Sequence, residues 1–363
     1  MKIAAVETIS VKVPFIFGGA PTGYGGRNWT TNNILLVKVQ TDTGLTGWGE
    51  AFCYGCTDAV RGALQSMIAP IVIGRDARDI AKLSRDLQQA LHLFGRYGIT
   101  LFALSGLDIA LWDIAGKAAG LPLCRLLGGA PREVPAYASL FRIGKADMVA
   151  ARVRLAVQQG YRWIKLHEKE VPEVRAAREA AGPDMPIMVD VNCPWTPEQA
   201  KENALKLKPF GMHWLEEPVF PPEDFRSLAR VRRETGVALA AGENACTAFQ
   251  FHEMLRAGAV DYAQPSVTKV GGITEFRKVM ALAASYGVTL MPHSPYFGPG
   301  FLATLHLAAA QGEPGSLIER FHIDLEASLY GQWIDPVNGM FKVPDGPGLG
   351  VEPDMKVIEK YRI

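Results

Sequence analysis

The chain has 363 residues, a formal net charge of +1, 48% hydrophobic residues and 21% charged residues. Its length is sufficient for one large α/β domain and a smaller one, and its composition is that of a soluble globular protein. The sequence has no strong excess of basic or acidic residues, so we expect no nucleic-acid or membrane partner. The N-terminus lacks a signal-peptide pattern and the five cysteines are scattered, so we expect a cytoplasmic protein with reduced thiols.

The sequence pattern divides the chain into two parts. Residues 1–125 contain strand-like stretches, a glycine-rich loop and helices rich in Ala and Leu, which predicts an α+β domain. From about residue 134, short apolar runs alternate with helix-period segments at intervals of about 25 residues. The runs are VPAYASLF, YRWIKLH, MPIMVDVN, MHWLEEP, VALAAGE, VDYAQPS, VTLMPHS and SLIERF. Eight such strand-and-helix units predict a closed parallel barrel.

Three carboxylates stand at the ends of consecutive apolar runs. Asp190, Glu216 and Glu243 end the third, fourth and fifth runs, at spacings of 26 and 27 residues. Barrel strands bring their C-terminal ends to one face, so we expect the three side chains to converge there. Any one of them alone is more simply explained as solvated or salt-bridged. Together they would repel one another unless a cation lay between them, and oxygen ligands suit Mg²⁺ or Mn²⁺.

Basic residues flank this predicted metal site. Lys165 and His167 end the second run and project to the same side of their strand, because side chains alternate along a strand. His293 ends the seventh run. A metal ion with a basic group on either side is what removal of the proton next to a carboxylate requires.

These residues resemble those of a known family, the mandelate racemase and muconate lactonizing group of the enolase superfamily. The resemblance covers nearly the whole chain and includes the helical signature ALSGLDIALWDIAGK at 103–117 and the segments VDVN, WLEEP and GEN at 189–192, 214–218 and 242–244. It implies an α/β fold with a (β/α)7β TIM-like barrel at 126–325 and an N-terminal α+β capping domain at 1–125. The C-terminal segment, 326–363, is expected to return and complete the capping domain.

The resemblance also implies roles for individual residues. The family usually carries Lys-x-Lys after the second strand, whereas this sequence has Lys165-Leu-His167, with a histidine in place of the second lysine. We therefore expect Lys165 to neutralise charge and His167 to be the base. Glu319, ending the eighth run, matches the family's acid, and burial would favour its neutral form. Many members place an aspartate beside the strand-seven histidine; here that residue is Ser266, so His293 should be a weaker base and a readier acid.

Further residues are expected around this centre. Asn192, Glu217, Ser266 and Lys269 should surround the metal ligands and the histidines. Candidates for substrate contact are Tyr24, Arg27 and Trp29 from the capping domain, and Arg142 and Tyr296 from the barrel.

The unsymmetrical pair of histidines favours one reaction over its alternatives. A racemase needs two comparable bases, whereas a dehydratase needs one base and an acid to protonate the departing hydroxyl. We therefore predict a Mg²⁺-dependent acid-sugar dehydratase with a 2-keto-3-deoxy product, acting on a small-molecule carboxylate and forming a homo-oligomer. Racemisation or epimerisation, lactonization, and a carboxylate-binding or scaffold protein without catalysis remain as alternatives.

Overall fold

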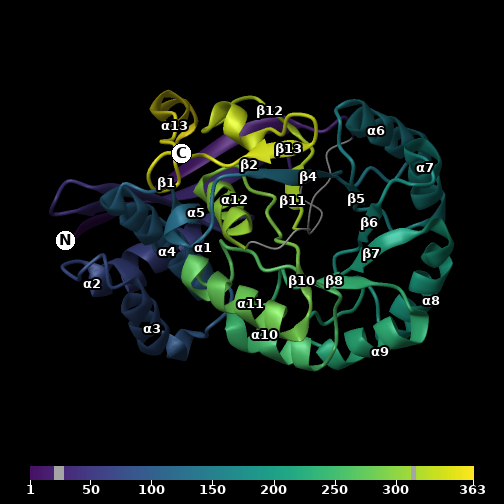
Figure 1. Ribbon diagram of the computed structural model, residues 1–363, viewed down its shortest axis with the longest axis horizontal. Coiled ribbons are helices and arrows are strands. Elements are labelled where there is room, and N and C mark those ends of the chain that lie inside the picture. The colour runs from purple at the N-terminus through teal and green to yellow at the C-terminus, as the bar shows by residue number, and fades with distance from the viewer. Residues whose placement is uncertain (20–27, 312–315) are drawn as a thin grey trace.

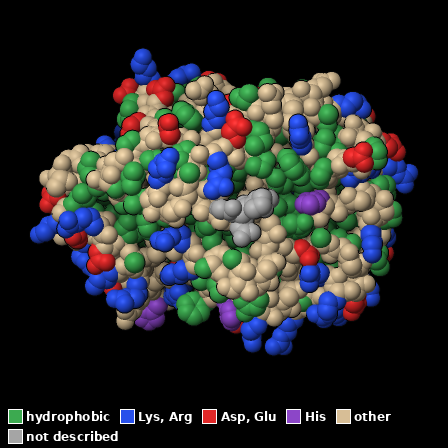
Figure 2. Space-filling model, viewed as in Figure 1, with side chains coloured by type: hydrophobic (Ala, Val, Ile, Leu, Met, Phe, Trp, Pro, Cys, Tyr) green, Lys and Arg blue, Asp and Glu red, His purple; other side chains and the backbone are tan. Residues whose placement is uncertain are grey.

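The computed structural model describes residues 1–19, 28–311 and 316–363 and consists of a capping domain packed against a barrel (Figure 1). Tyr24 and Arg27, two of the predicted substrate contacts, lie outside the described residues. On the face seen in Figure 2, side chains of both charge signs are scattered among one another, in keeping with the net charge of +1.

The capping domain is an antiparallel sheet covered by helices. Its strands are β1 (Ile3–Ile16), β2 (Thr31–Thr41) and β3 (Thr46–Ala51), and the sheet order is β12-β1-β2-β3. The helices are α1 (Thr57–Ala63), α2 (Ala69–Val72), α3 (Ile80–Ala90), α4 (Ile99–Ala119) and the short α5 (Leu123–Leu126), with a π-helical turn at Leu64–Ile68 between α1 and α2. The predicted α+β character of this region is confirmed.

Helix α4 is the core helix of this domain. By length and composition it could cross a membrane, but 78% of its apolar window is buried inside the protein. It packs so closely on β3 that a Cβ added at Gly49 would lie 1.9 Å from the carbonyl oxygen of Gly106. Glycine is therefore required at that crossing, and the helix ends at Gly120, whose φ of 66° is easily adopted without a side chain.

The barrel contains the eight predicted strands in parallel. They are β4 (Glu133–Ser139), β5 (Ile164–Leu166), β6 (Ile187–Asp190), β7 (Met212–Glu216), β8 (Leu239–Ala241), β9 (Tyr262–Ala263), β10 (Thr289–Leu290) and β11 (Ile318–Phe321). Their order is β10-β9-β8-β7-β6-β5-β4-β11, so the last strand lies beside the first. Ser316 Oγ, 2.9 Å from the carbonyl oxygen of Leu290, links the β10 and β11 sides. This arrangement confirms the predicted (β/α)7β barrel.

Among the described residues, seven α-helices connect these strands around the outside of the barrel (Figure 1). They are α6 (Ala146–Gln158), α7 (Val171–Ala181), α8 (Pro197–Leu207), α9 (Phe225–Thr235), α10 (Thr247–Arg256), α11 (Gly272–Tyr286) and α12 (Pro299–Ala310). The start of α8 is fixed by a capping box, in which Thr196 accepts from the backbone of Gln199 and Gln199 accepts from the backbone of Thr196. Helices α9 and α11 end at Gly236 and Gly287 in the left-handed conformation.

The chain that follows β11 contacts both domains, and its return to the capping domain begins at Asp324, two residues before the predicted segment 326–363. Strand β12 (Asp324–Leu325) pairs with β1 of the capping sheet, and β13 (Met340–Lys342) pairs with β4 of the barrel. The backbone N–H of Leu349 donates to Asp113 on α4 at 2.8 Å, and helix α13 (Met355–Tyr361) packs against β1. The returning chain therefore fixes the capping domain above the barrel, which positions the cap residues that line the site described next.

Candidate active site

The three predicted metal ligands lie together at the C-terminal ends of neighbouring strands. Asp190 ends β6 and is the register partner of Glu216, which ends β7. Glu243 follows β8, and one ligand oxygen from each of the three lies within 4.8 Å of the others. An all-carboxylate oxygen set of this size fits a hard divalent ion such as Mg²⁺.

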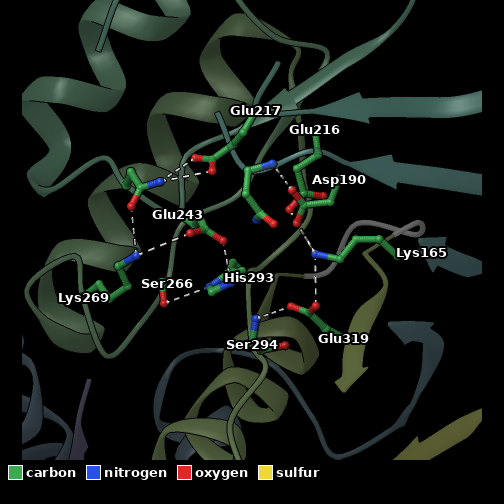
Figure 3. Close-up of polar contacts among 12 residues, drawn as sticks. Lys165, Asp190, Glu216, Glu217, Glu243, Ser266, Lys269, His293, Ser294 and Glu319 are labelled. Atoms are coloured by element: carbon green, nitrogen blue, oxygen red, sulfur yellow. Dashed lines mark hydrogen bonds and ion pairs between the residues drawn. The ribbon is translucent and has the colours of Figure 1, made fainter. Parts of the chain in front are cut away.

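Lys165, on β5, points into this carboxylate cluster (Figure 3). Its Nζ lies 3.0 Å from Glu216 Oε1, 3.1 Å from Glu319 Oε1 and 3.2 Å from Asp190 Oδ2, and the side chain is 1% exposed. Burial acts to lower the pKa of Lys165, but the surrounding carboxylates raise it well above its usual value. Burial and the charge of Asp190 raise the pKa of Glu216 to about 7 despite the opposing effect of Lys165.

Burial favours the neutral form of Glu319, as expected, but neighbouring groups oppose it. Burial does act to raise the pKa of Glu319, but the ammonium of Lys165 and the nearby His293 lower it below its ordinary value. The carboxylate also accepts the backbone N–H of Ser294 at 3.1 Å (Figure 3). Both contacts favour the ionised form, because each places positive charge or a donor at its oxygens.

His167 lies at the cavity-facing side of the cluster with a defined tautomer. Its Nδ1 is 2.7 Å from the carbonyl oxygen of Leu140, which can only accept, so Nδ1 carries a proton. Its Nε2 is 3.3 Å from Asp190 Oδ2. Burial acts to lower the pKa of His167, but the charge and hydrogen bond of Asp190 raise it overall. In the neutral ring, Nε2 is thus the atom that can take a proton.

His293 has a different environment on each side of its ring. Its Nε2 is 2.7 Å from Glu243 Oε2, whereas its Nδ1 is 3.4 Å from Ser266 Oγ (Figure 3). Tyr296 adds a second hydroxyl, which contacts Ser266 and lies 3.5 Å from the same Nδ1. The structure therefore places two hydroxyls where many family members have a carboxylate.

The remaining predicted polar residues support the ligand strands. Both oxygens of Glu217 accept from Asn244 Nδ2, at 3.0 and 3.1 Å, and Lys269 Nζ lies 3.7 Å from Glu243 Oε1 and 3.3 Å from Asn244 Oδ1. Asn192 donates its backbone N–H to Asp190 Oδ1 at 3.0 Å. Asn192 and Glu217 adopt φ values of 52° and 47°, a conformation that is unusual for residues with side chains and that concentrates at functional sites.

A cavity of about 380 Å³ opens beside this cluster, between the two domains. Its barrel wall includes His167, His293 and Glu243, whereas Lys165 and Asp190 lie behind that wall and are each 1% exposed. Further lining residues from the barrel are Phe141, Arg142, Lys169, Asn192, Tyr296, Glu319 and Phe321, and the cap contributes Trp29, Asn32, Asn33, Glu50, Phe52 and Tyr54 among others. The predicted contacts Trp29, Arg142 and Tyr296 all face this cavity.

Trp29 offers the cavity its ring rather than its polar group. Its Nε1 already donates to the carbonyl oxygen of Thr31 at 2.7 Å, and the indole stacks on Phe321 with ring centroids 5.5 Å apart. It is therefore suited to cover an apolar face of a ligand.

Sequence reasoning missed several polar residues that line the cavity, among them Glu50 and Asn32 of the cap and Lys169 of the barrel. Glu50, on β3, is 4% exposed and accepts the backbone N–H of Gly300 at 2.9 Å, at the start of α12. Burial raises its pKa to about 7. Asn32 is 7% exposed and its Nδ2 has no partner among the described residues. A carboxylate within an apolar strand was a usable signal for Glu50, and a cation shortly after His167 was one for Lys169.

Comparison with known proteins places this fold and site in one family. Residues 19–128 match the mandelate racemase / muconate lactonizing enzyme N-terminal domain, and residues 147–357 match the enolase C-terminal domain-like family. The chain belongs to the mandelate racemase and muconate lactonizing enzyme family of the enolase superfamily. The predicted resemblance is thus confirmed.

Three relatives illustrate the chemistry found in this family. The chain is 35% identical to arabinonate dehydratase of Saccharolobus solfataricus, over 91% of this chain and 90% of that protein. It is also 35% identical to D-galactarolactone cycloisomerase of Agrobacterium fabrum, over 91% of both. A crystal structure of L-talarate dehydratase from Polaromonas sp. JS666, complexed with Mg and L-glucarate, superimposes with a TM-score of 0.85 at 29% identity, covering 100% of this chain and 97% of that one. The carboxylate triad and this magnesium-bound relative together support Mg²⁺ as the metal.

Proposed function

We infer that this protein is an acid-sugar dehydratase, which removes the proton next to a substrate carboxylate and eliminates the hydroxyl on the neighbouring carbon as water. The observation that carries this proposal is the unequal pair of histidines facing one cavity: Asp190 and a backbone carbonyl hold His167, whereas Glu243 and two hydroxyls surround His293. The similarity to arabinonate dehydratase and L-talarate dehydratase supports the same reaction class.

His167 is the proposed base. Its Nδ1 proton is engaged by Leu140, so Nε2 takes the proton from the carbon next to the carboxylate. The neighbouring Asp190 then stabilises the positive charge that forms on the ring.

His293 is the proposed acid. Its protonated Nε2 gives a proton to the departing hydroxyl on the next carbon, so the hydroxyl leaves as water and the enol product rearranges to a 2-keto-3-deoxy acid. Glu243 Oε2 lies 2.7 Å from this Nε2, so the nitrogen that gives up the proton is the one that faces the carboxylate cluster. Ser266 and Tyr296 hold the other ring nitrogen without adding a charge there.

Asp190, Glu216 and Glu243 would hold the divalent ion, with Lys165 neutralising their remaining charge from behind. When bound, the ion supplies positive charge that stabilises the negative charge developing on the substrate carboxylate. Carboxylate ligands also accommodate Mn²⁺, which we propose as a substitute for Mg²⁺.

The test is product formation from a panel of aldonic and aldaric acids with Mg²⁺, read as 2-keto acid and, in D₂O, as loss of the α-proton signal by NMR. We expect a keto acid from at least one acid sugar. His167→Gln should abolish both signals, with a loss of roughly 10²-fold or more. His92→Gln is the matched control, because His92 is exposed, lies outside the cavity, and places its Nδ1 2.7 Å from the carbonyl oxygen of Gln89 in its own turn.

Two other outcomes would replace the proposal. Exchange of the α-proton with inversion but without keto acid would mean racemisation or epimerisation by His167 and His293. Isomerisation of an acid-sugar lactone without loss of water would indicate a cycloisomerase, a candidate favoured by the 35% identity to D-galactarolactone cycloisomerase. The homo-oligomeric state and the cytoplasmic location stay predictions.

A further inference from the structure

The charged side chains that line the cavity fall into two groups. Three carboxylates have partners: Glu243 contacts an imidazole, Glu319 contacts a buried ammonium, and Glu50 accepts a backbone N–H. Arg142 and Lys169 line the same cavity, and within the described part of the chain neither makes a hydrogen bond or an ion pair. Within the described residues, the cavity wall thus carries two cations that make no ion pair.

These two cations lie close together because of the barrel topology. Arg142 follows β4 and Lys169 follows β5, and these strands are parallel neighbours in which Ser139 pairs with Lys165. Both residues therefore emerge at the same stretch of the barrel rim. Their mutual influence is visible in the pKa of Lys169, which burial and then the positive charge of Arg142 lower overall, although the charges of Asp190 and Glu170 act in the opposite direction.

Two neighbouring like charges, one of them half-buried, are unfavourable unless an anion joins them. Glu170, the next residue after Lys169, is exposed and makes no ion pair with it within the described ranges. The segment 20–27, APTGYGGR, contains no acidic residue, so it has no carboxylate to contribute. The missing counter-charge is therefore best supplied by a ligand.

Resting on the proposed function, we propose that Arg142 and Lys169 bind a second carboxylate of the substrate, so that the preferred acid sugar is a dicarboxylate, an aldarate, rather than an aldonate. The reacting carboxylate belongs with the cluster of Asp190, Glu216 and Glu243, which Lys165 already neutralises from behind (Figure 3). A second, distal carboxylate matches the planar donor fork of an arginine beside a lysine.

The cap side of the cavity suits the hydroxyl-bearing carbons between the two carboxylates. Asn32 Nδ2 is buried without a partner among the described residues, and Glu50 lies on the neighbouring strand β3. Buried polar atoms without partners usually find one in a ligand or in water. A polyol chain would supply hydroxyls for them, whereas an aromatic or aliphatic chain would not.

The test compares kcat/KM for an aldarate and for the aldonate of the same configuration, with Mg²⁺, in the wild type and in Arg142→Gln and Lys169→Gln. We expect the wild type to prefer the aldarate, and each substitution to lower the aldarate-to-aldonate ratio about tenfold. Arg154→Gln removes the same charge from an exposed position on α6 away from the cavity and should leave the ratio unchanged.

A wild type that prefers the aldonate, or substitutions that reduce both substrates equally, would overturn the second-carboxylate site and leave the dehydratase proposal standing. Calorimetric binding to His167→Gln with Mg²⁺ separates the two proposals, because it requires no turnover. Tighter binding of the aldarate than of the aldonate, lost in the double variant with Arg142→Gln, supports the site even if no acid sugar is dehydrated. Equal binding of both acids overturns it.

Discussion

Replacing Lys165 by Met should strongly destabilise the metal-free protein. The ammonium lies 3.0–3.2 Å from three carboxylates, and all four side chains are at most 2% exposed. Removing one partner from such a buried network leaves uncompensated charge and costs about 3–5 kcal/mol. We expect the melting temperature in EDTA to fall by roughly 4–7 °C, measured by circular dichroism. Excess Mg²⁺ should restore part of this loss, because the ion replaces the missing positive charge.

The loss in Lys165→Met should also grow with pH. Burial already holds the pKa of Glu216 at about 7 with Lys165 present. Without the ammonium, the folded-state pKa of Glu216 rises further above its unfolded value, so stability that is present at low pH is lost as the pH rises from about 4.5 through about 7. Lys201→Met is the control, because its ion pair with Glu234 is 47% and 42% exposed and contributes at most about 1 kcal/mol. Equal melting temperatures for the two variants in EDTA would refute this reasoning.

Three further perturbations test other parts of the structure. Mg²⁺ at about 100 times its Kd should stabilise the wild type by about 2.7 kcal/mol in thermal melts, and Asp190→Asn should lose most of that gain. An equal gain in both proteins would contradict the assignment of Asp190 as a metal ligand. Gly49→Ala should destabilise the protein by about 3 kcal/mol or more in urea unfolding, because the new methyl group meets the backbone of α4. Gly62→Ala, where the new methyl group has no atom within 4 Å, should instead stabilise the protein by about 0.5–1 kcal/mol. Similar effects of the two substitutions would show that β3 and α4 can separate. Burial raises the pKa of Glu50 to about 7, so the free energy of unfolding of the wild type should fall by up to about 3 kcal/mol between about pH 4.5 and about pH 7. Glu50→Gln should flatten this dependence of stability on pH. The same slope in both proteins would mean that Glu50 ionises freely.

The sequence by itself determined the barrel and the place of its carboxylates. Apolar runs at regular intervals have one stable arrangement, in which parallel strands bury them and intervening helices cover them. Because every strand then points the same way, residues at the ends of the runs must meet at one face. The convergence of Asp190, Glu216 and Glu243 follows from that rule, and the capping box at Thr196 follows from its local sequence, in which Gln199 stands three residues later.

Only the tertiary structure decided how charge is distributed around those carboxylates. The pKa of Glu319 is lowered despite its burial because Lys165, from a different strand, points between it and the triad. Glu50 reaches the cavity through a contact with Gly300, 250 residues further along the chain. Periodicity gives the direction of a side chain within its own strand or helix, but a pKa or a cavity wall depends on groups brought in by packing from other elements. The unpaired cations Arg142 and Lys169 became visible for the same reason, since a missing partner can be recognised only when all neighbours are in place.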